Sequence, residues 1–337
     1  MVANVQTGVF AGINGKFNPA WHGLGINLLD GFTSDEACTY VGIDYPIVLK
    51  QLSVDSPYLG CARMLDHYAI IRDDTQEVFG YVTGDYHPLQ NKEAFSILDG
   101  LVEDEKIQYE SVVILGRGER VALLARIPEC DFELGTNGVD KNETYMLLHT
   151  GHDGKSKVRI LPTSVRVVCQ NTLSLALSTG KGKGFAVKHS AKMHDRIAEG
   201  MRILKNSIQA FQKYAQQAKN LANETFLLNR MIELAEKVTI KMYSLDEIVE
   251  NTEKESLKQR RAKETLQAMI SNYDNERNSL PGIAGTKWAA FNAVTEYIDH
   301  NQKYRGDTRT RQENRFDNLI LGKGDEIKEY ALQYLLA

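Results

Sequence analysis

The chain has 337 residues, of which 42% are hydrophobic, 8% aromatic and 25% charged, and these fractions are ordinary for a globular protein. The N-terminus has no basic segment leading into an apolar run, and no apolar run is as long as the ~18 residues that a membrane span needs. The four cysteines are far apart and include no C-x-x-C pair, which disfavours a zinc ribbon or a redox motif. We therefore expect a cytoplasmic protein with reduced thiols, no export signal and no membrane span.

Residues 1–60 are rich in glycine and predict mainly loops, and the pattern from residue 47 to 161 predicts mainly strands. A helix is expected at 34–41, where Thr33 or Ser34 provides the N-cap and acids occupy the first turn. A second short helix should begin near Leu89. The expected strands, several of them joined by Gly-rich or Asp-rich turns, are 47–49, 68–72, 78–82, 111–115, 121–127, 145–148 and 158–161.

Residues 165–177 predict a change from strand to helix. The run 165–169 is rich in β-branched residues, and Asn171 suits the N-cap of a helix that would include Leu173 and Leu177.

The chain from residue 191 onward predicts helices, because apolar residues recur at spacings of three and four. Ser244 and Glu247 have the spacing of a capping box that would open another helix. A helix is expected at 286–300, then a polar loop that carries Arg305, Arg309, Arg311 and Arg315, and a terminal helix at 326–336. The predicted fold class is α+β, with an antiparallel β-rich domain with packed helices at 1–190 and a mainly helical region at 191–337.

Three motifs resemble a phage/plasmid-like family of mobile genetic elements. They are PAWHGLG at 19–25, VRVVCQNTL at 165–173 and GTKWAAFNAVTEY at 285–297. The resemblance implies that the chain comes from a phage, prophage or plasmid and works in the cytoplasm of a bacterial host cell. It supplies no catalytic residues.

Positive charge is concentrated in residues 155–205, which hold 11 Lys and Arg against two acids. Residues 1–154 carry 10 basic and 23 acidic side chains, and residues 206–337 carry 19 of each, although the whole chain has a net charge of only −4. Such a concentration favours a polyanionic partner. Alternatively, this basic segment pairs with the acidic N-terminal half, within one chain or between subunits.

We expect this segment to bind nucleic acid, because Lys and Arg displace condensed counterions from phosphates. The predicted phosphate contacts are Arg159, Arg166, Lys181, Lys183, Lys188, Lys192 and Arg196. Phe185 is the first candidate for stacking on a base, with Tyr86 or Tyr109 as further candidates. The predicted function is non-enzymatic binding or annealing of single-stranded DNA in recombination or replication. The layout of hairpins, a helix and a basic groove is similar to phage annealases of the Erf and Red-beta kind, which implies a homo-oligomer.

A second hypothesis is a regulatory or anti-defence protein that binds a host protein. Its acidic N-terminal surface would imitate the charge of DNA, through Asp73, Asp74, Glu103, Asp104 and Glu105.

An enzyme is the third hypothesis, and the sequence favours it least. It would be built around His22, His87 or His149 with Asp66 or Asp153, or around Cys169 with His149 or His189 as base. The turn 151–156 ends like a phosphate-binding loop, but His149 stands where that motif requires glycine. His149, His152 and Asp153 are ordinary metal ligands, yet they share one turn with no distant partner. We therefore expect no metal and no cofactor.

Overall fold

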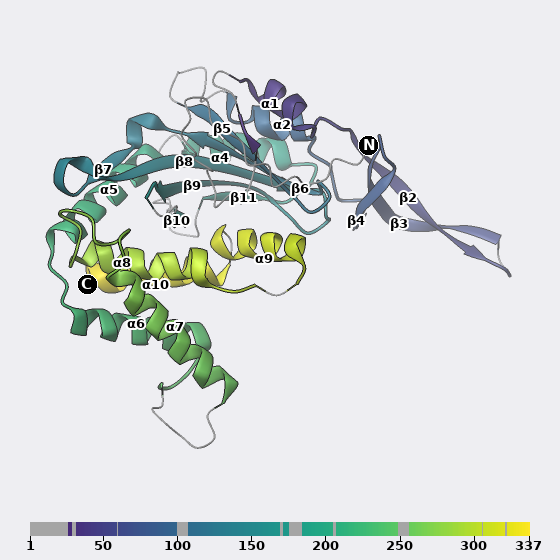
Figure 1. The fold of residues 1–337 in the computed structure, drawn as a ribbon. Helices are drawn as coiled ribbons and strands as arrows, with labels where there is room; N and C mark the ends of the chain where they lie inside the picture. Colours follow the sequence, from purple (N-terminus) through teal and green to yellow (C-terminus); the bar gives the residue numbers. More distant parts are fainter. Residues whose placement is uncertain are drawn as a thin grey trace. The chain divides into compact units, whose positions relative to one another are not determined.

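The computed structural model describes ten stretches of the chain (Figure 1). They are residues 26–28, 32–58, 60–99, 107–168, 171–174, 184–204, 207–248, 256–304, 306–320 and 322–337. The chain divides into two compact units. Unit 1 comprises residues 1–129, 145–162 and 176–208, and unit 2 comprises 130–144, 163–175 and 209–337.

A three-stranded antiparallel sheet and two short helices form one part of unit 1. The strands pair in the order β2 (Ile47–Ser56), β3 (Gly60–Arg72) and β4 (Glu77–Thr83), and the helices are α1 (Ser34–Val41) and α2 (Asn91–Ser96). Thr33 is the N-cap of α1, as expected, and it forms a capping box: Thr33 Oγ1 accepts from the Glu36 N–H and the Glu36 carboxylate accepts from the Thr33 N–H.

The second sheet has eight strands and contributes to both units through β8 and β9. Its main order is β1-β5-β6-β8-β9-β10, with β11 also paired to β9 and β7 also paired to β8. The bounds are β1 (Ile26–Asn27), β5 (Gln108–Leu115), β6 (Arg120–Arg126), β7 (Phe132–Leu134), β8 (Asp140–Gly151), β9 (Val158–Arg166), β10 (Asn171–Ser174) and β11 (Phe185–Val187). In unit 1, helix α4 (Met193–Leu204) packs against β11.

Helices make up most of unit 2. They are α5 (Ser207–Asn223), which begins at the end of unit 1, α6 (Leu228–Tyr243), α7 (Leu257–Tyr273), α8 (Lys287–Glu296), α9 (Thr308–Ile320) and α10 (Lys323–Leu336). A π-helical turn, Tyr297–Asn301, continues α8. Antiparallel sheets over 26–187 followed by helices over 193–336 confirm the predicted α+β class. Within the described residues, no helix is both long enough and apolar enough to cross a bilayer.

The helix expected from Asn171 is wrong over the residues that the structure describes. Residues 171–174 form strand β10, and Asn171 pairs with Arg166 while Ser174 pairs with Thr163 on β9. Asn171 therefore belongs to a strand antiparallel to β9 and is not the N-cap of a helix. The Asn171 side chain is used in tertiary hydrogen bonds, which explains why local capping propensity was misleading.

Two expectations in the C-terminal part are also wrong. Ser244 ends α6 rather than opening a helix, because it adopts the left-handed conformation (φ 49°) and its N–H bonds back to the Ile240 and Lys241 carbonyls. The polar loop expected around Arg311 and Arg315 is helix α9. Phe316 and Leu319 on α9 are fully buried, so its tertiary packing outweighs its polar composition.

Candidate nucleic-acid interface

Three of the predicted phosphate contacts lie exposed where strand β11 leads into helix α4 in unit 1. Lys188 follows β11, Lys192 precedes α4, and Arg196 lies in the first turn of α4. Among the described residues, none of these three side chains forms an ion pair with an acid. Their charges are therefore available to a phosphate from solvent.

Strand β9 adds cations beside β11. Arg159 pairs with Ala186, and Val158 pairs with Val187, so Lys157 and Lys188 lie at the same end of the two strands. Arg159 is half-buried, and this burial lowers the pKa of its guanidinium, which nevertheless stays protonated as arginine does in proteins. Cations from β9 and from the β11–α4 segment thus meet at one place in unit 1.

Arg120 belongs to the same group of charges. The pKa of the buried His149 imidazole is lowered to about 3, first by burial and then by the positive charges of Arg120 and Arg159. Arg120 pairs with Gly151, where a Cβ would lie 2.7 Å from the Ser156 Cβ and 3.0 Å from the Arg120 Cγ, so the missing side chain makes room for both residues. Arg120 cannot be recognised from the sequence, because only the register of β6 on β8 places it on the face of His149.

The turn that follows β8 is a hairpin turn and not a phosphate-binding loop. The Asp153 carboxylate accepts hydrogen bonds from the backbone N–H groups of Lys155 (2.8 Å) and Ser156 (2.7 Å). Burial raises the pKa of Asp153, but hydrogen bonds from Ser156 and Lys155 outweigh it and the net pKa is lowered. Gly154 supplies the positive φ (76°) that the turn needs. The Asp153 carboxylate at this turn would repel a phosphate.

Other residues that the sequence suggested as nucleic-acid contacts have different surroundings. Phe185 is half-buried, and its ring is covered by α4 at Gly200, where a Cβ would approach it to 2.6 Å. Lys181 and Lys183 lie outside the described residues. Tyr86 is stacked on His189 and Tyr109 donates to Asp99, and both rings are buried, so neither is placed to stack on a base.

Arg166 lies elsewhere, in unit 2, where it is buried. Its side chain is 2% exposed and its Nε donates to Asp140 Oδ1 at 2.7 Å. Its other nitrogens donate to Asn278 Oδ1 (2.6 Å) and to the Arg277 carbonyl (3.0 Å). A guanidinium with this set of internal partners is a structural group, and we do not place it at a phosphate.

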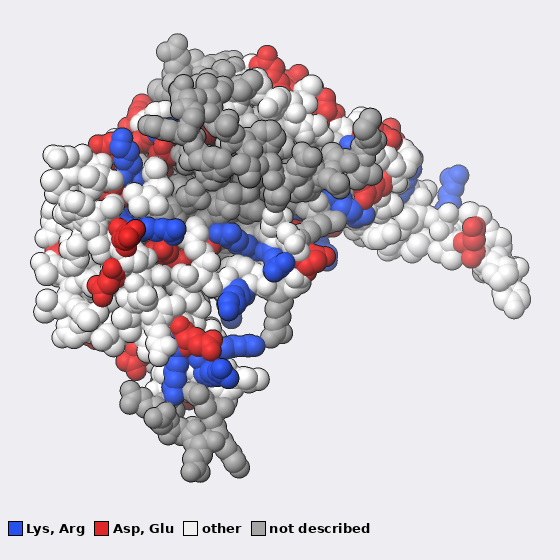
Figure 2. Space-filling view, viewed as in Figure 1, with Lys and Arg blue, Asp and Glu red and all other residues white. Residues whose placement is uncertain are grey.

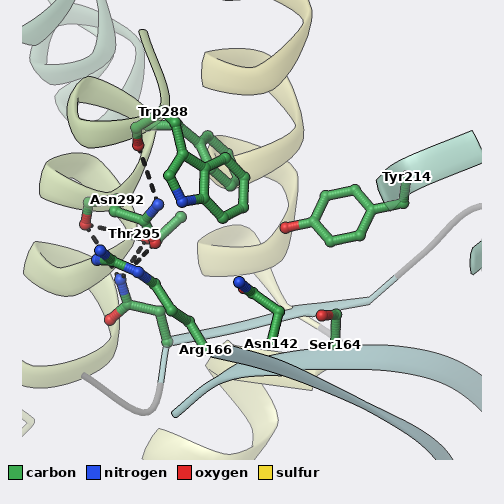
Figure 3. Close-up of a pocket in the computed structure, with 9 residues that line it drawn as sticks. Asn142, Ser164, Arg166, Tyr214, Trp288, Asn292 and Thr295 are labelled. Carbon is green, nitrogen blue, oxygen red and sulfur yellow. Dashed lines mark hydrogen bonds between the residues drawn. The ribbon is translucent and has the colours of Figure 1, made fainter. Parts of the chain in front are cut away.

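Arg166 joins a buried polar cluster that unites two of the three motifs singled out in the sequence (Figure 3). Trp288 Nε1 donates to Asp140 Oδ2 at 2.8 Å. Asn171 Nδ2 donates to Thr295 Oγ1 at 2.8 Å and to the carbonyl of Asn292 at 3.1 Å. VRVVCQNTL at 165–173 and GTKWAAFNAVTEY at 285–297 therefore meet inside unit 2, 121 residues apart at Asn171 and Asn292.

This cluster surrounds a cavity of only about 10 Å³. That volume suits a single water molecule, because a buried water needs roughly 10–15 Å³ of this measure and several polar partners. A substrate has no room there. We therefore interpret the cluster as a specific polar core of unit 2.

The structure also locates the residues of the other hypotheses. His152 is buried and its Nε2 lies 3.0 Å from Asn91 Oδ1, whereas His87 is exposed. Asp74 pairs with Arg72 at 2.7 Å, so part of the expected acidic surface is neutralised. His22, Cys169 and residues 103–105 lie outside the described residues. Among those that are described, no three His, Cys, Asp or Glu side chains gather as a metal site would require.

The described residues form a mixed α+β fold in which basic side chains of β9 and of the β11–α4 segment lie together in unit 1. The chain belongs to the family described as Domain of unknown function (DUF932), whose model matches residues 78–320. That match includes both motifs of the buried cluster and the basic segment. Comparison with curated proteins gave no match, and comparison with solved structures gave none.

Proposed function

We propose that this protein binds single-stranded nucleic acid through the basic surface of unit 1, without catalysing a reaction on it. We define this basic surface as Lys157, Arg159, Lys188, Lys192 and Arg196, with Arg120 beside it. The observation that carries the proposal is the exposure of Lys188, Lys192 and Arg196 without acidic partners among the described residues.

Several exposed cations elsewhere on the described surface pair with acids. Figure 2 shows blue and red side chains side by side over α7, where Arg260 and Glu264 are 3.5 Å apart. In α6, Lys237 and Arg230 both approach Glu233. Helix α4 does carry exposed Asp195 and Glu199, but its flanking segment supplies the excess of positive charge.

The nucleic-acid proposal is supported by the kind of contacts available. Lys and Arg provide affinity for phosphates that does not depend on sequence. Phe185 lies on the same strand segment but its ring packs against α4 at Gly200, so the proposal rests on the exposed cations and not on base stacking. Strand annealing during recombination or replication of a phage or plasmid would use this binding. The resemblance of the three motifs to phage/plasmid-like proteins supports that setting.

The test is fluorescence anisotropy with a labelled oligonucleotide and with its duplex, each across a salt series. We expect tighter binding of the single strand and a linear fall of log K with log salt, followed by faster annealing of complementary strands in the presence of the protein. Absence of binding to either form at low salt would refute the proposal. That result would favour the alternative, a regulatory protein with a protein partner, which a pull-down would then examine.

A further inference from the structure

Three buried polar side chains of unit 1 pack together next to the segment that carries the basic surface. They are Tyr86 (9% exposed), which lies between β4 and α2, His152 (0%), which follows β8, and His189 (5%), which lies between β11 and α4. The Tyr86 and His189 rings stack with their centroids 5.0 Å apart, and 6.2 Å separates the centroids of His152 and His189. We call these three residues the histidine cluster. It joins three segments of unit 1 that are far apart in the sequence.

His189 connects this cluster to the basic surface. It directly follows Lys188 and lies three residues before Lys192, and both of these lysines are exposed while the His189 side chain is buried. Strand β11 pairs with β9 through only three residues, 185–187. A strand this short depends on the packing of neighbouring side chains to stay in place. The buried ring of His189 therefore helps to hold the segment that presents Lys188 and Lys192.

Several polar atoms of the histidine cluster have no hydrogen-bond partner among the described residues. Asn91 Nδ2 donates to the Ile43 carbonyl at 2.9 Å, so Asn91 Oδ1 accepts from His152 Nε2 at 3.0 Å. That bond places the proton on Nε2 and leaves His152 Nδ1 as a bare acceptor. His152 Nδ1, both ring nitrogens of His189 and the Tyr86 hydroxyl bond to no described residue. A protonated ring here would be a buried charge with an unpaired N–H, which costs free energy.

Burial is the main reason why both histidines stay neutral. It lowers the pKa of His152 to about 3 and that of His189 to about 4, and a charge on His189 further disfavours one on His152. The Asp153 carboxylate acts on both rings in the opposite direction, as the His87 backbone does on His189, without outweighing burial. The Tyr86 hydroxyl stays neutral, because burial raises its pKa well above the usual value.

One exposed contact between α4 and α2 responds to acid in the opposite direction. His194 Nδ1 lies 3.5 Å from a Glu93 carboxylate oxygen, and the two side chains attract each other as ions only when His194 is protonated. The two side chains are 62% and 48% exposed, so water and salt screen this attraction. We therefore expect the buried histidines to determine the response to acid.

Acid should favour a state in which the β11–α4 segment is open. There the histidines reach water and bind protons near their ordinary pKa of 6.5, whereas in the closed segment they do so only near pH 3–4. Stability of the closed segment is thus fully present above pH 6.5 and is lost as the pH falls. At pH 5, each histidine raises the ratio of open to closed segment by about 30-fold relative to neutral pH. Opening one segment requires less free energy than unfolding the whole protein.

We propose that acid opens the β11–α4 segment by charging the two histidines of the cluster, and that this opening switches off the basic surface. The inference rests on the proposed function, because it concerns regulation of the same site.

The test is anisotropy with a labelled thymidine homopolymer at constant ionic strength from pH 7.5 to pH 5, a range in which thymine does not titrate. We expect Kd to rise at least about threefold, because only the closed fraction binds. Attraction between charges alone predicts unchanged or tighter binding in acid. His189→Phe and His152→Gln cannot be protonated there, so each should flatten the pH dependence. The matched control His87→Gln replaces an exposed histidine and should retain it.

Hydrogen exchange read by mass spectrometry measures the opening without nucleic acid. After correction for the intrinsic effect of pH, we expect faster exchange in β11 and the start of α4 at pH 5 than at pH 7.5. Strand β6 serves as the internal reference, and His189→Phe should remove the difference. Circular dichroism at both pH values verifies that the protein and each variant stay folded.

Unchanged or tighter binding at pH 5 would overturn the proposal, and so would equal weakening in the wild type and both histidine variants. Equal corrected exchange of β11 at the two pH values would also overturn it. Absence of binding at pH 7.5 would instead refute the proposed function. The exchange measurement would then still decide whether acid opens the segment.

Discussion

Asp140 and Arg166 form an ion pair from which solvent is excluded: their side chains are 0% and 2% exposed and 2.7 Å separates the Arg166 Nε from the Asp140 carboxylate. The same carboxylate accepts the Trp288 indole N–H through its second oxygen. One carboxylate of β8 thus joins the end of β9 to the start of α8 within unit 2.

Removing this carboxylate should destabilise unit 2 strongly. Asp140→Leu leaves the buried Arg166 charge without the Asp140 carboxylate, which costs about 3–5 kcal/mol of the free energy of unfolding. Urea unfolding followed by tryptophan fluorescence, to which Trp288 beside the pair contributes, measures it. Asp140→Leu/Arg166→Met should recover much of the loss. The control is Asp74→Leu, which breaks an exposed pair with Arg72 and should cost about 1 kcal/mol or less. Equal losses in Asp140→Leu and the control would contradict this account.

A second buried pair should behave in the same way. Lys328 of α10 and Asp299 of the π-helical turn form an ion pair, and both side chains are 0% exposed. Lys328→Met keeps most of the side-chain volume but leaves Asp299 without that partner, so we expect a loss of about 3–5 kcal/mol in the same urea assay. Lys237→Met removes an exposed lysine that bonds Glu233 at 2.9 Å. A loss below 1 kcal/mol in both variants would show that the buried pair contributes no more than the surface pair.

These two buried pairs illustrate which structural features can be predicted from the sequence and which cannot. Hairpins and amphipathic helices can be predicted from the spacing of apolar residues along the sequence. The class α+β was predicted in that way. Arg166 was expected at a phosphate because a strand cation next to a basic loop looks exposed. Its burial depends on Asp140 and Asn278, which are 26 and 112 residues away. Lys188, Lys192 and Arg196 are exposed: the first two lie in the connection between β11 and α4, and Arg196 lies in α4.

Acid should destabilise unit 1 through its buried histidines. Burial lowers the pKa of His152 to about 3 and that of His189 to about 4, as it does for His149. The unfolded chain binds these protons near pH 6.5, so stability is fully present above that pH and is lost as the pH falls toward 4. Each histidine contributes a slope of about 1.4 kcal/mol per pH unit in this window.

Chemical unfolding at pH 7, 6 and 5 measures this slope. His189→Phe keeps a ring beside Tyr86 and should make the pH dependence shallower. His87→Gln replaces an exposed histidine and should leave it unchanged. A slope that is the same in His189→Phe and the wild type would contradict the assignment.

Gly184 should be needed for the basic surface although it carries no charge. Its φ is +68°, and a Cβ would lie 2.3 Å from the Ile160 carbonyl oxygen of the paired strand β9. Gly184→Ala should therefore displace β11 and weaken oligonucleotide binding severalfold. Gly285→Ala is the matched control, because Gly285 has a similar φ of +71° but no atom within 4 Å of a Cβ. Equal binding by the two variants would argue against a role for β11.

The central claim is best tested by the salt dependence of single-strand binding in two triple variants. Lys188→Ala/Lys192→Ala/Arg196→Ala removes three exposed cations of the basic surface. Lys213→Ala/Lys219→Ala/Arg230→Ala removes three exposed cations of unit 2 and changes the net charge equally. Each lost phosphate contact contributes roughly 0.7 to the slope of log K against log salt for single strands. We therefore predict that the basic-surface triple variant lowers the magnitude of this slope by about 2. The unit 2 triple variant should leave the slope unchanged. Equal slopes for the wild type and both variants would contradict the account.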